Sequence, residues 1–456
     1  MIDPYTPALE QARLVAKREV SAAELVELYL GRISEHNPAL NAYWLLTPEL
    51  AREQAAQPAG RDPLSGAPVS IKDLVALSGY PTTYGSRAFV DNVTDFDQFP
   101  VARIKAQGSP ILVKTTTPEF GSRPVTEFGL HGIARNPWNP DHSAGGSSGG
   151  AAAAVAAGLC SWAHGTDGGG SIRIPASCCG LVGLKPSRGR VSRGPIQGEG
   201  WAGLATDGVI GRTVADAAAG LDAIAGHLPG DPYWAELPSP LLGSARGAPP
   251  RPLRIGFTTR ARVTVNPEVV ACVKAAARAC AGAGHQVSEG GPQTQEFELP
   301  QRVIVMTGTA AWQVPDISVL DPINRNAFEH APRVTAADYY KAVTAVRNHS
   351  RLVVAFWDDH DVLITPTLTE PAPRNGTMGA DPATAHIQNL EWLSFTYPYN
   401  CTGQPAISLP LGTTRAGLPI GVQLVGPPLG ESVILALAAQ LEESMPWRDR
   451  RPPAFA

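Results

Sequence analysis

The chain has 456 residues, of which 43% are hydrophobic, 17% are charged, 46 are glycine and 43 are proline. This length and apolar content suffice for a large core, so the chain as a whole is not disordered, and its glycines show no collagen-like period. The net charge of −4 leaves no basic field for nucleic acid or an anionic membrane. Length alone allows three domains or one large sheet domain.

Two further features bear on the compartment. No run of about 18 apolar residues indicates a membrane span, and residues 1–30 lack the regions of a secretory signal. None of the six cysteines has the C-x₂-C spacing of a zinc or redox site; they are Cys160, Cys178, Cys179, Cys272, Cys280 and Cys401. We therefore expect buried thiols in a cytoplasmic protein.

The N-terminal half contains several clear local signals. Ser21 and Glu24 have the spacing of a capping box, and the apolar residues that follow predict a helix. Residues 67–75 predict a short strand with Ser70 and Lys72 on one face. The next predicted elements are a helix from Val101, a Gly-Ser-Pro turn, the strand 111–113, a glycine-rich loop at 145–150 and an alanine-rich helix at 151–157.

The C-terminal half continues the alternation of strands and helices. A Pro/Gly-rich connector covers 228–252, and the strand 253–258 follows it. Asn266 and Pro267 predict the start of a helix that ends near residue 281. A helical region at 336–358 precedes strands at 361–365, 405–411 and 419–426. This pattern predicts an α/β protein, and the connector fits either a domain boundary or a crossing within one sheet.

Lys72 is the first residue that could carry chemistry. A lysine between Ile71 and Leu74 in a strand is poorly solvated, and two roles fit it. It is either a lysine whose ammonium reaches water at the strand end, or a desolvated lysine that serves as a base.

The loop Gly145–Gly150, with Ser147 and Ser148 at its centre, is the second candidate. It lacks the Lys-Ser/Thr of a P-loop and the G-x-G-x-x-G pattern, which excludes a phosphate cradle. It formally fits G-x-S-x-G, but the preceding Asn136–Ser143 segment cannot form the strand that a nucleophile elbow needs. The remaining interpretation is a loop whose glycines allow close approach to a reacting centre.

The third candidate is the segment Thr166–Pro175. Gly168, Gly169 and Gly170 precede Ser171 and leave backbone N–H groups unshielded, as an oxyanion hole requires. A tight turn capped by Ser171 is the structural alternative.

Together the three segments resemble the amidase signature enzymes. Ser-Ile-Lys-Asp at 70–73 lies upstream of Gly-Gly-Ser-Ser-Gly-Gly at 145–150, and Ser171 in Asp-Gly-Gly-Gly-Ser-Ile-Arg lies 24 residues after Ser147. The resemblance extends along nearly the whole chain, through 114–119, 135–139, 179–186, 365–367, 403–410 and 417–423. It implies one amidase domain over 1–456, with a large mixed central sheet covered by helices on both faces.

The resemblance also implies a role for each site residue. Ser171 would be the acylated nucleophile, Ser147 a bridging serine held by a cis peptide, and Lys72 the ultimate base. The N–H groups of Gly168, Gly169, Gly170 and Ser171 would bind the oxyanion. The supporting residues would be Ser148, Thr166, Asp167 and Arg173. This agrees with the chemistry, because a serine needs an adjacent base and a desolvated lysine can replace histidine.

Other conspicuous residues carry less information. The histidines, including His142 and His164, show no ligand spacing, so neither a metal nor another cofactor is expected. Large apolar side chains line either the core or a substrate pocket, and the candidates for the pocket are Trp201, Met306, Trp312, Phe395, Tyr397 and Tyr399.

The substrate class rests on the resemblance. Leu393 lies where the glutaminase subunit of tRNA-dependent amidotransferases usually has an aspartate that holds the substrate's amino group. The C-terminal segment from Phe395 instead looks like that of bacterial aryl-acylamidases and nylon-oligomer hydrolases. We also expect that the protein is a urethanase-like member of the family. We therefore expect a monomer or homodimer that hydrolyses small neutral amides and also aryl esters and carbamates. The alternatives are the glutaminase subunit and a non-catalytic ligand-binding protein.

Overall fold

The structure is a computed structural model that describes residues 2–236, 240–381 and 384–455. Within these residues an 11-stranded sheet has the order β1-β3-β2-β6-β8-β7-β12-β13-β11-β9-β10. Its strands are β1 (Tyr43–Leu46), β2 (Val69–Lys72), β3 (Ile111–Thr115), β6 (Trp162–Asp167), β7 (Val182–Lys185), β8 (Thr206–Gly211), β9 (Arg254–Phe257), β10 (Gln286–Glu289), β11 (Val362–Pro366), β12 (Ala406–Thr413) and β13 (Pro419–Val425). A small ribbon pairs β4 (Arg135–Asn136) with β5 (Asn139–Ser143).

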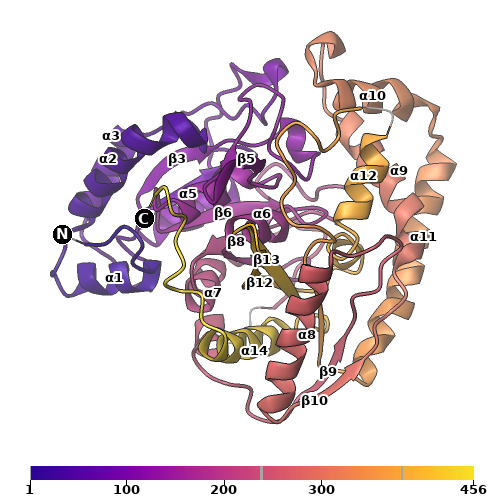
Figure 1. Cartoon of the computed structure of the whole chain (residues 1–456). Helices are drawn as coiled ribbons and strands as arrows, with labels where there is room; N and C mark the ends of the chain where they lie inside the picture. The colour runs from indigo at the N-terminus through magenta and orange to yellow at the C-terminus, as the bar shows by residue number, and fades with distance from the viewer. Residues whose placement is uncertain (1, 237–239, 382–383, 456) are drawn as a thin grey trace.

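Helices fill most of the connections between the strands (Figure 1). They are α1 (Ala8–Ala16), α2 (Ala22–Leu40), α3 (Pro48–Ala55), α4 (Phe99–Ala106), α5 (Gly149–Ala156), α6 (Arg173–Cys179), α7 (Val214–Ile224), α8 (Pro267–Gly282), α9 (Glu298–Ala310), α10 (Pro322–His330), α11 (Ala336–Val354), α12 (Ala385–Trp392), α13 (Pro398–Cys401) and α14 (Glu431–Ser444).

The sheet is mixed, as the sequence predicted. Strands β3, β2 and β6 run parallel to one another at one end, and β11, β9 and β10 form a second parallel group at the other. The strands between these groups pair antiparallel. Parallel groups require crossover helices, which explains the alternation of strands and helices in the sequence.

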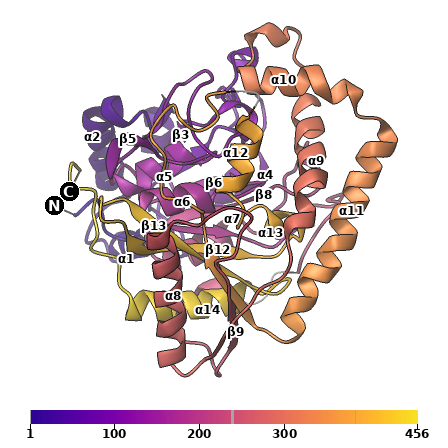
Figure 2. The same ribbon diagram turned by 45° about the vertical axis from the view of Figure 1, so that its right-hand side comes forward.

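Both faces of the sheet are covered. Successive side chains of a strand point to opposite faces, and β11 shows the result. Val362 and Ile364 pack into a core layer with α1, α4, α7, α8 and α14, whereas Leu363 packs into the layer that contains α5, α6, α9 and α11. Figure 2 shows α9 and α11 side by side, with α10 at one end of the pair.

Several local predictions match the observed elements closely. The capping box of Ser21 and Glu24 begins α2, and the Asn266 side chain caps α8 with Pro267 at its first position. The predicted strand at 67–75 is shorter in the structure, where β2 ends at Lys72. The helical region at 336–358 is α11 followed by one 3₁₀ turn.

The connector 228–252 packs against the body of the protein. Its 3₁₀ helix Leu241–Arg246 begins where the N–H groups of Leu241 and Leu242 donate to the Asp222 carboxylate of α7, both at 2.9 Å. Residues 237–239 of the connector lie outside the described residues.

The two ends of the chain meet beside α1 (Figure 1). The Tyr5 hydroxyl donates to the carbonyl oxygen of Phe455, and Arg451 forms an ion pair with Asp3 at 2.5 Å. In the described part of the chain, no helix has the length and apolar character needed to span a membrane. All six cysteines are buried and free.

Candidate active site

The predicted site forms where the parallel strands β2 and β6 end. Lys72 is the last residue of β2, and its side chain is fully buried. Its Nζ lies 2.7 Å from Ser147 Oγ and 2.9 Å from Thr166 Oγ1 on β6. Ser147 follows a cis peptide bond with Gly146, and its carbonyl oxygen accepts the Thr117 hydroxyl at 2.9 Å. Folding thus brings Lys72 and Ser147 into direct contact across 75 residues of sequence.

Burial changes the protonation of Lys72. Desolvation lowers its pKa to about 7, although the carboxylates of Asp167 and Asp207 act in the opposite direction. Arg193 adds a further lowering effect. At neutral pH a large fraction of Lys72 is therefore a neutral amine, which can accept a proton from the Ser147 hydroxyl at the observed distance.

Ser171 begins the turn from β6 into α6. It lines the same cavity as Ser147 and Thr166, and 8% of its surface is exposed. Its carbonyl oxygen accepts the N–H of Ser148 at 3.1 Å, and Ser148 Oγ donates to the Thr166 carbonyl oxygen at 3.3 Å. Ser148 therefore ties the loop before α5 to the loop before α6.

The glycines before Ser171 form a loop organised by Asp167. Its carboxylate accepts the N–H of Gly170 at 2.7 Å and that of Ile172 at 3.2 Å. Over the described residues, the N–H groups of Gly168, Gly169 and Ser171 have no protein acceptor. The expectation of four free donors is thus corrected for Gly170, whose N–H is used to shape the loop. Gly170 also has φ +133°, and a Cβ there would lie 2.4 Å from Thr396 Oγ1.

Arg173 holds this loop against the rest of the sheet. Burial would raise the pKa of Asp167, but the Arg173 guanidinium beside it keeps that pKa well below its usual range. Arg173 donates to both Asp167 carboxylate oxygens at 2.8 and 2.9 Å. Its other bonds reach Thr396 O at 2.9 Å, Gln423 Oε1 at 2.7 Å and Asn400 Oδ1 at 2.7 Å. This buried network positions the loop and leaves no proton transfer for Arg173.

The two serines face a cavity of about 590 Å³, called the catalytic cavity below. Aromatic rings make up much of its wall; they are Tyr84, Phe89, Phe120, Trp201, Trp312 and Tyr339. The rings of Phe120 and Trp312 stack with centroids 5.3 Å apart. A Cβ at Gly168 or at Gly308 would lie 2.6 Å from the Trp201 ring, so glycines at both positions make room for the indole.

A polar wall completes the catalytic cavity. Arg193, Gln197 and Glu199 line it, and the Arg193 guanidinium donates to Asp207 Oδ2 at 2.9 Å. The other oxygen of Asp207 lies 2.9 Å from His164 Nε2. His164 thus joins a hydrogen-bonded chain that leads through Asp207 and Arg193 to the cavity.

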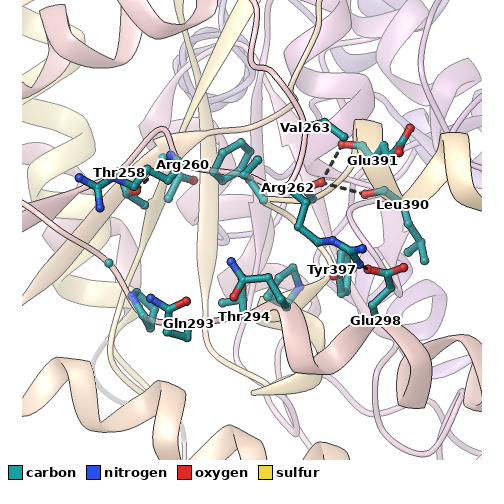
Figure 3. A pocket seen from close by; sticks show the side chains of 18 of the residues that line it. Thr258, Arg260, Arg262, Val263, Gln293, Thr294, Glu298, Leu390, Glu391 and Tyr397 are labelled. Atoms are coloured by element: carbon teal, nitrogen blue, oxygen red, sulfur yellow. Dashed lines mark hydrogen bonds and ion pairs between the residues drawn. The ribbon is translucent and has the colours of Figure 1, made fainter.

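The predicted pocket residues separate into three groups. Trp201 and Trp312 line the catalytic cavity, whereas Met306 lies on α9 and lines neither this cavity nor the one that contains the other three. The structure places Phe395, Tyr397 and Tyr399 in the wall of a second cavity (Figure 3). The separation arises because Thr396 faces the glycine loop, where its hydroxyl donates to the Gly169 carbonyl oxygen at 2.7 Å.

Several residues of the site carry no recognisable signal in the sequence. Tyr84, Phe89 and Phe120 look like ordinary core aromatics in the sequence, although Phe120 directly follows one of the family motifs, 114–119. Arg193 and Asp207 show no local pattern at all. Among the described residues, no group of three or more His, Cys, Asp and Glu side chains is arranged to hold a metal ion.

Comparison with known proteins agrees with this geometry. The amidase family profile matches residues 24–435. The 6-aminohexanoate-cyclic-dimer hydrolase of Paenarthrobacter ureafaciens is 37% identical over 99% of this chain and 97% of its own length. A solved structure of 6-aminohexanoate cyclic dimer hydrolase complexed with substrate superposes with a TM-score of 0.95 at 35% identity, covering 100% of both chains. A bacterial aryl acylamidase structure of the amidase signature family has a TM-score of 0.88 at 28% identity, covering 97% of each chain. Because the match spans nearly the whole chain, the protein belongs to the amidase signature family of amidohydrolases.

Proposed function

We propose that this amidohydrolase cleaves small, neutral, hydrophobic amides through an acyl-enzyme on Ser171. One observation carries the proposal: the buried Lys72 amine lies 2.7 Å from Ser147 Oγ, and Ser147 and Ser171 line one cavity. A serine hydroxyl is a weak nucleophile unless a base takes its proton, and Lys72 is such a base because its pKa is about 7.

In the first half of the reaction, neutral Lys72 accepts the proton of Ser147, and Ser147 accepts the proton of Ser171. Ser171 Oγ then bonds to the carbonyl carbon of the substrate, and the carbonyl oxygen becomes an oxyanion. The free N–H groups of Gly168, Gly169 and Ser171 stabilise this charge. When the intermediate collapses, the C–N bond breaks and the departing nitrogen takes the proton back along the same path.

In the second half, water attacks the acyl carbon. Its proton passes by the same path to Lys72, and the Ser171–acyl bond breaks when Ser171 regains a proton. The products are a carboxylic acid and an amine, so atoms and charge balance. A carbamate or aryl ester presents the same carbonyl to the same donors, so we propose both as additional substrates.

The aromatic wall supports the hydrophobic substrate class. Flat rings such as Phe120 and Trp312 favour an aryl or alkyl group over a charged one. The named relatives act on 6-aminohexanoate cyclic dimer, or are called acylamidases, which agrees with linear and cyclic amides. Leu393 is buried and does not line the catalytic cavity, so this position supplies no carboxylate to hold the amino group of glutamine.

The test compares the wild type with Ser171→Ala on anilides, aryl esters, carbamates and glutamine. We expect anilide turnover well above glutamine turnover, its loss in Ser171→Ala, and a fluorophosphonate adduct on Ser171 by mass spectrometry. Absence of both turnover and adduct would remove Ser171 as the nucleophile. Glutamine turnover above anilide turnover would restore the glutaminase alternative.

A further inference from the structure

A second cavity, of about 370 Å³, lies beyond the segment Phe395–Tyr399 (Figure 3). Its wall combines the loop after β9, the loop after β10, Thr365 of β11, and the end of α12 with the residues that follow. No residue of the catalytic cavity is among those lining it. We call it the switch-point cavity, because it lies where the connections between strands change sides of the sheet.

The sheet changes its winding direction at this cavity. From β9 the chain crosses through α8 to β10 on one side, and it then returns through α9, α10 and α11 to β11 on the other side of β9. Val269 and Val273 of α8 pack on one face of the sheet, whereas Val346 and Val353 of α11 pack on the opposite face. The loops that leave the carboxyl ends of β9 and β10 therefore diverge to opposite faces of the sheet. Ligands of α/β proteins commonly bind in the crevice between two such loops.

Two buried tyrosines face this crevice without partners. Tyr397 is 5% exposed and Tyr399 is 3% exposed, and both line the switch-point cavity. Neither hydroxyl has a hydrogen-bond partner among the described residues. Burial raises the pKa of both phenols, so each remains a donor at any physiological pH. Both hydroxyls therefore open onto the cavity, where they can donate to a ligand that supplies an acceptor oxygen.

The charges at the cavity select neither an anion nor a cation, because Arg260 lines it as well as Glu289 and Glu391. Side chains of both signs line it, and Arg262 forms an ion pair with Glu298 close to Tyr397 (Figure 3). The apolar part of the wall includes Leu390 and Phe395. An uncharged molecule with a carbonyl oxygen, an N–H group and an apolar body satisfies all three features, and an amide has each of them.

The same segment also contacts the catalytic loop. Thr396, which precedes Tyr397, donates to the Gly169 carbonyl oxygen at 2.7 Å and accepts from Arg173 at 2.9 Å. A Cβ at Gly169 would lie 3.8 Å from Tyr397 Cβ. A ligand that contacts Tyr397 therefore lies against the segment that holds the loop presenting the oxyanion donors.

We propose that the switch-point cavity binds a second molecule of neutral amide, and that its occupancy changes turnover at Ser171. This inference rests on the proposed function for its choice of ligand. The probe is acetanilide, titrated calorimetrically into full-length enzyme whose Ser171 carries a phenylmethanesulfonyl group that blocks the catalytic cavity. We expect one remaining binding site.

Three variants identify that site. Tyr397→Phe removes one donor and should weaken acetanilide binding about 3- to 10-fold. Ile387→Trp fills the entrance from an exposed position of α12 and should abolish the binding. The control Tyr340→Phe, an exposed tyrosine of α11 that lines neither cavity, should bind as the wild type does. The rate of sulfonylation of Ser171 shows that each variant is folded.

Kinetics give the second readout. In the wild type, the plot of initial rate against acetanilide concentration should deviate from a hyperbola. In Ile387→Trp the same plot should be hyperbolic. The inference is overturned if blocked enzyme binds no acetanilide, or if Tyr397→Phe and Ile387→Trp both bind it like the wild type. Failure of Ser171 to react at all would instead count against the proposed function, and the same variants made in Ser171→Ala would still test the cavity.

Discussion

Replacement of Lys72 by methionine tests the proton path most directly. Methionine keeps the length and apolar volume of the buried lysine stem, so no large cavity forms in the sheet. The substitution removes the amine 2.7 Å from Ser147 Oγ and leaves Ser147, Ser171 and the glycine loop in place. Any loss of rate is then attributable to the missing base rather than to collapse of the site.

The expected magnitude follows from the burial of Lys72. Lowering its pKa from 10.5 to about 7 corresponds to about 5 kcal/mol of differential solvation. At pH 7 this lower pKa increases the neutral fraction of Lys72 from about one molecule in 3000 to about half. Positioned proton transfer contributes about 10²- to 10⁴-fold to a rate. We expect anilide kcat/KM to fall by about 10³-fold or more in Lys72→Met.

An ester should respond differently, because an aryl oxide departs without the proton that an amine needs. The assay therefore measures kcat/KM of the wild type and Lys72→Met on an anilide and on the nitrophenyl ester of the same acid. We expect the ester to lose at least about tenfold less than the anilide. Small and equal losses on both substrates would refute the reasoning and make Lys72 a structural residue. In the wild type, kcat/KM should fall as pH drops below about 7, because Lys72 becomes protonated.

Three further predictions concern the surroundings of this proton path. Arg193→Met removes a cation that lowers the pKa of Lys72, so the acid limb of the pH–rate profile should move to higher pH, whereas an unchanged limb would refute the coupling. Gly168→Ala places a Cβ 2.6 Å from the Trp201 ring and should lower anilide kcat by about 10- to 100-fold; wild-type kcat would refute it. Arg173→Met strands the buried Asp167 charge and should cost about 3–5 kcal/mol in urea unfolding, and a loss below about 1 kcal/mol would contradict that role.

The sequence by itself determined much of the local structure and named the groups that we propose to react. A capping box begins α2, and an Asn-Pro start begins α8, because these signals depend only on side chains a few residues apart. The three motifs around Lys72, Ser147 and Ser171 were recognisable for a related reason. Glycines and small polar residues are needed wherever backbone approaches a reacting carbonyl, and this need leaves a pattern within a short segment.

Only the tertiary structure decided what surrounds those groups. Asp207 and His164 meet because β6 and β8 pair in the sheet, and Arg193 joins them from the loop between β7 and β8. No spacing in the sequence encodes these contacts. Tyr397 looked like a substrate-pocket residue, yet the turn of the chain at Thr396 points its ring into another cavity. Even within a motif the sequence did not show which N–H groups are free, because the N–H of Gly170 donates to Asp167. Short sequence motifs specify which candidate groups are present, whereas strand order and backbone direction decide which side chains surround them and which N–H groups remain free.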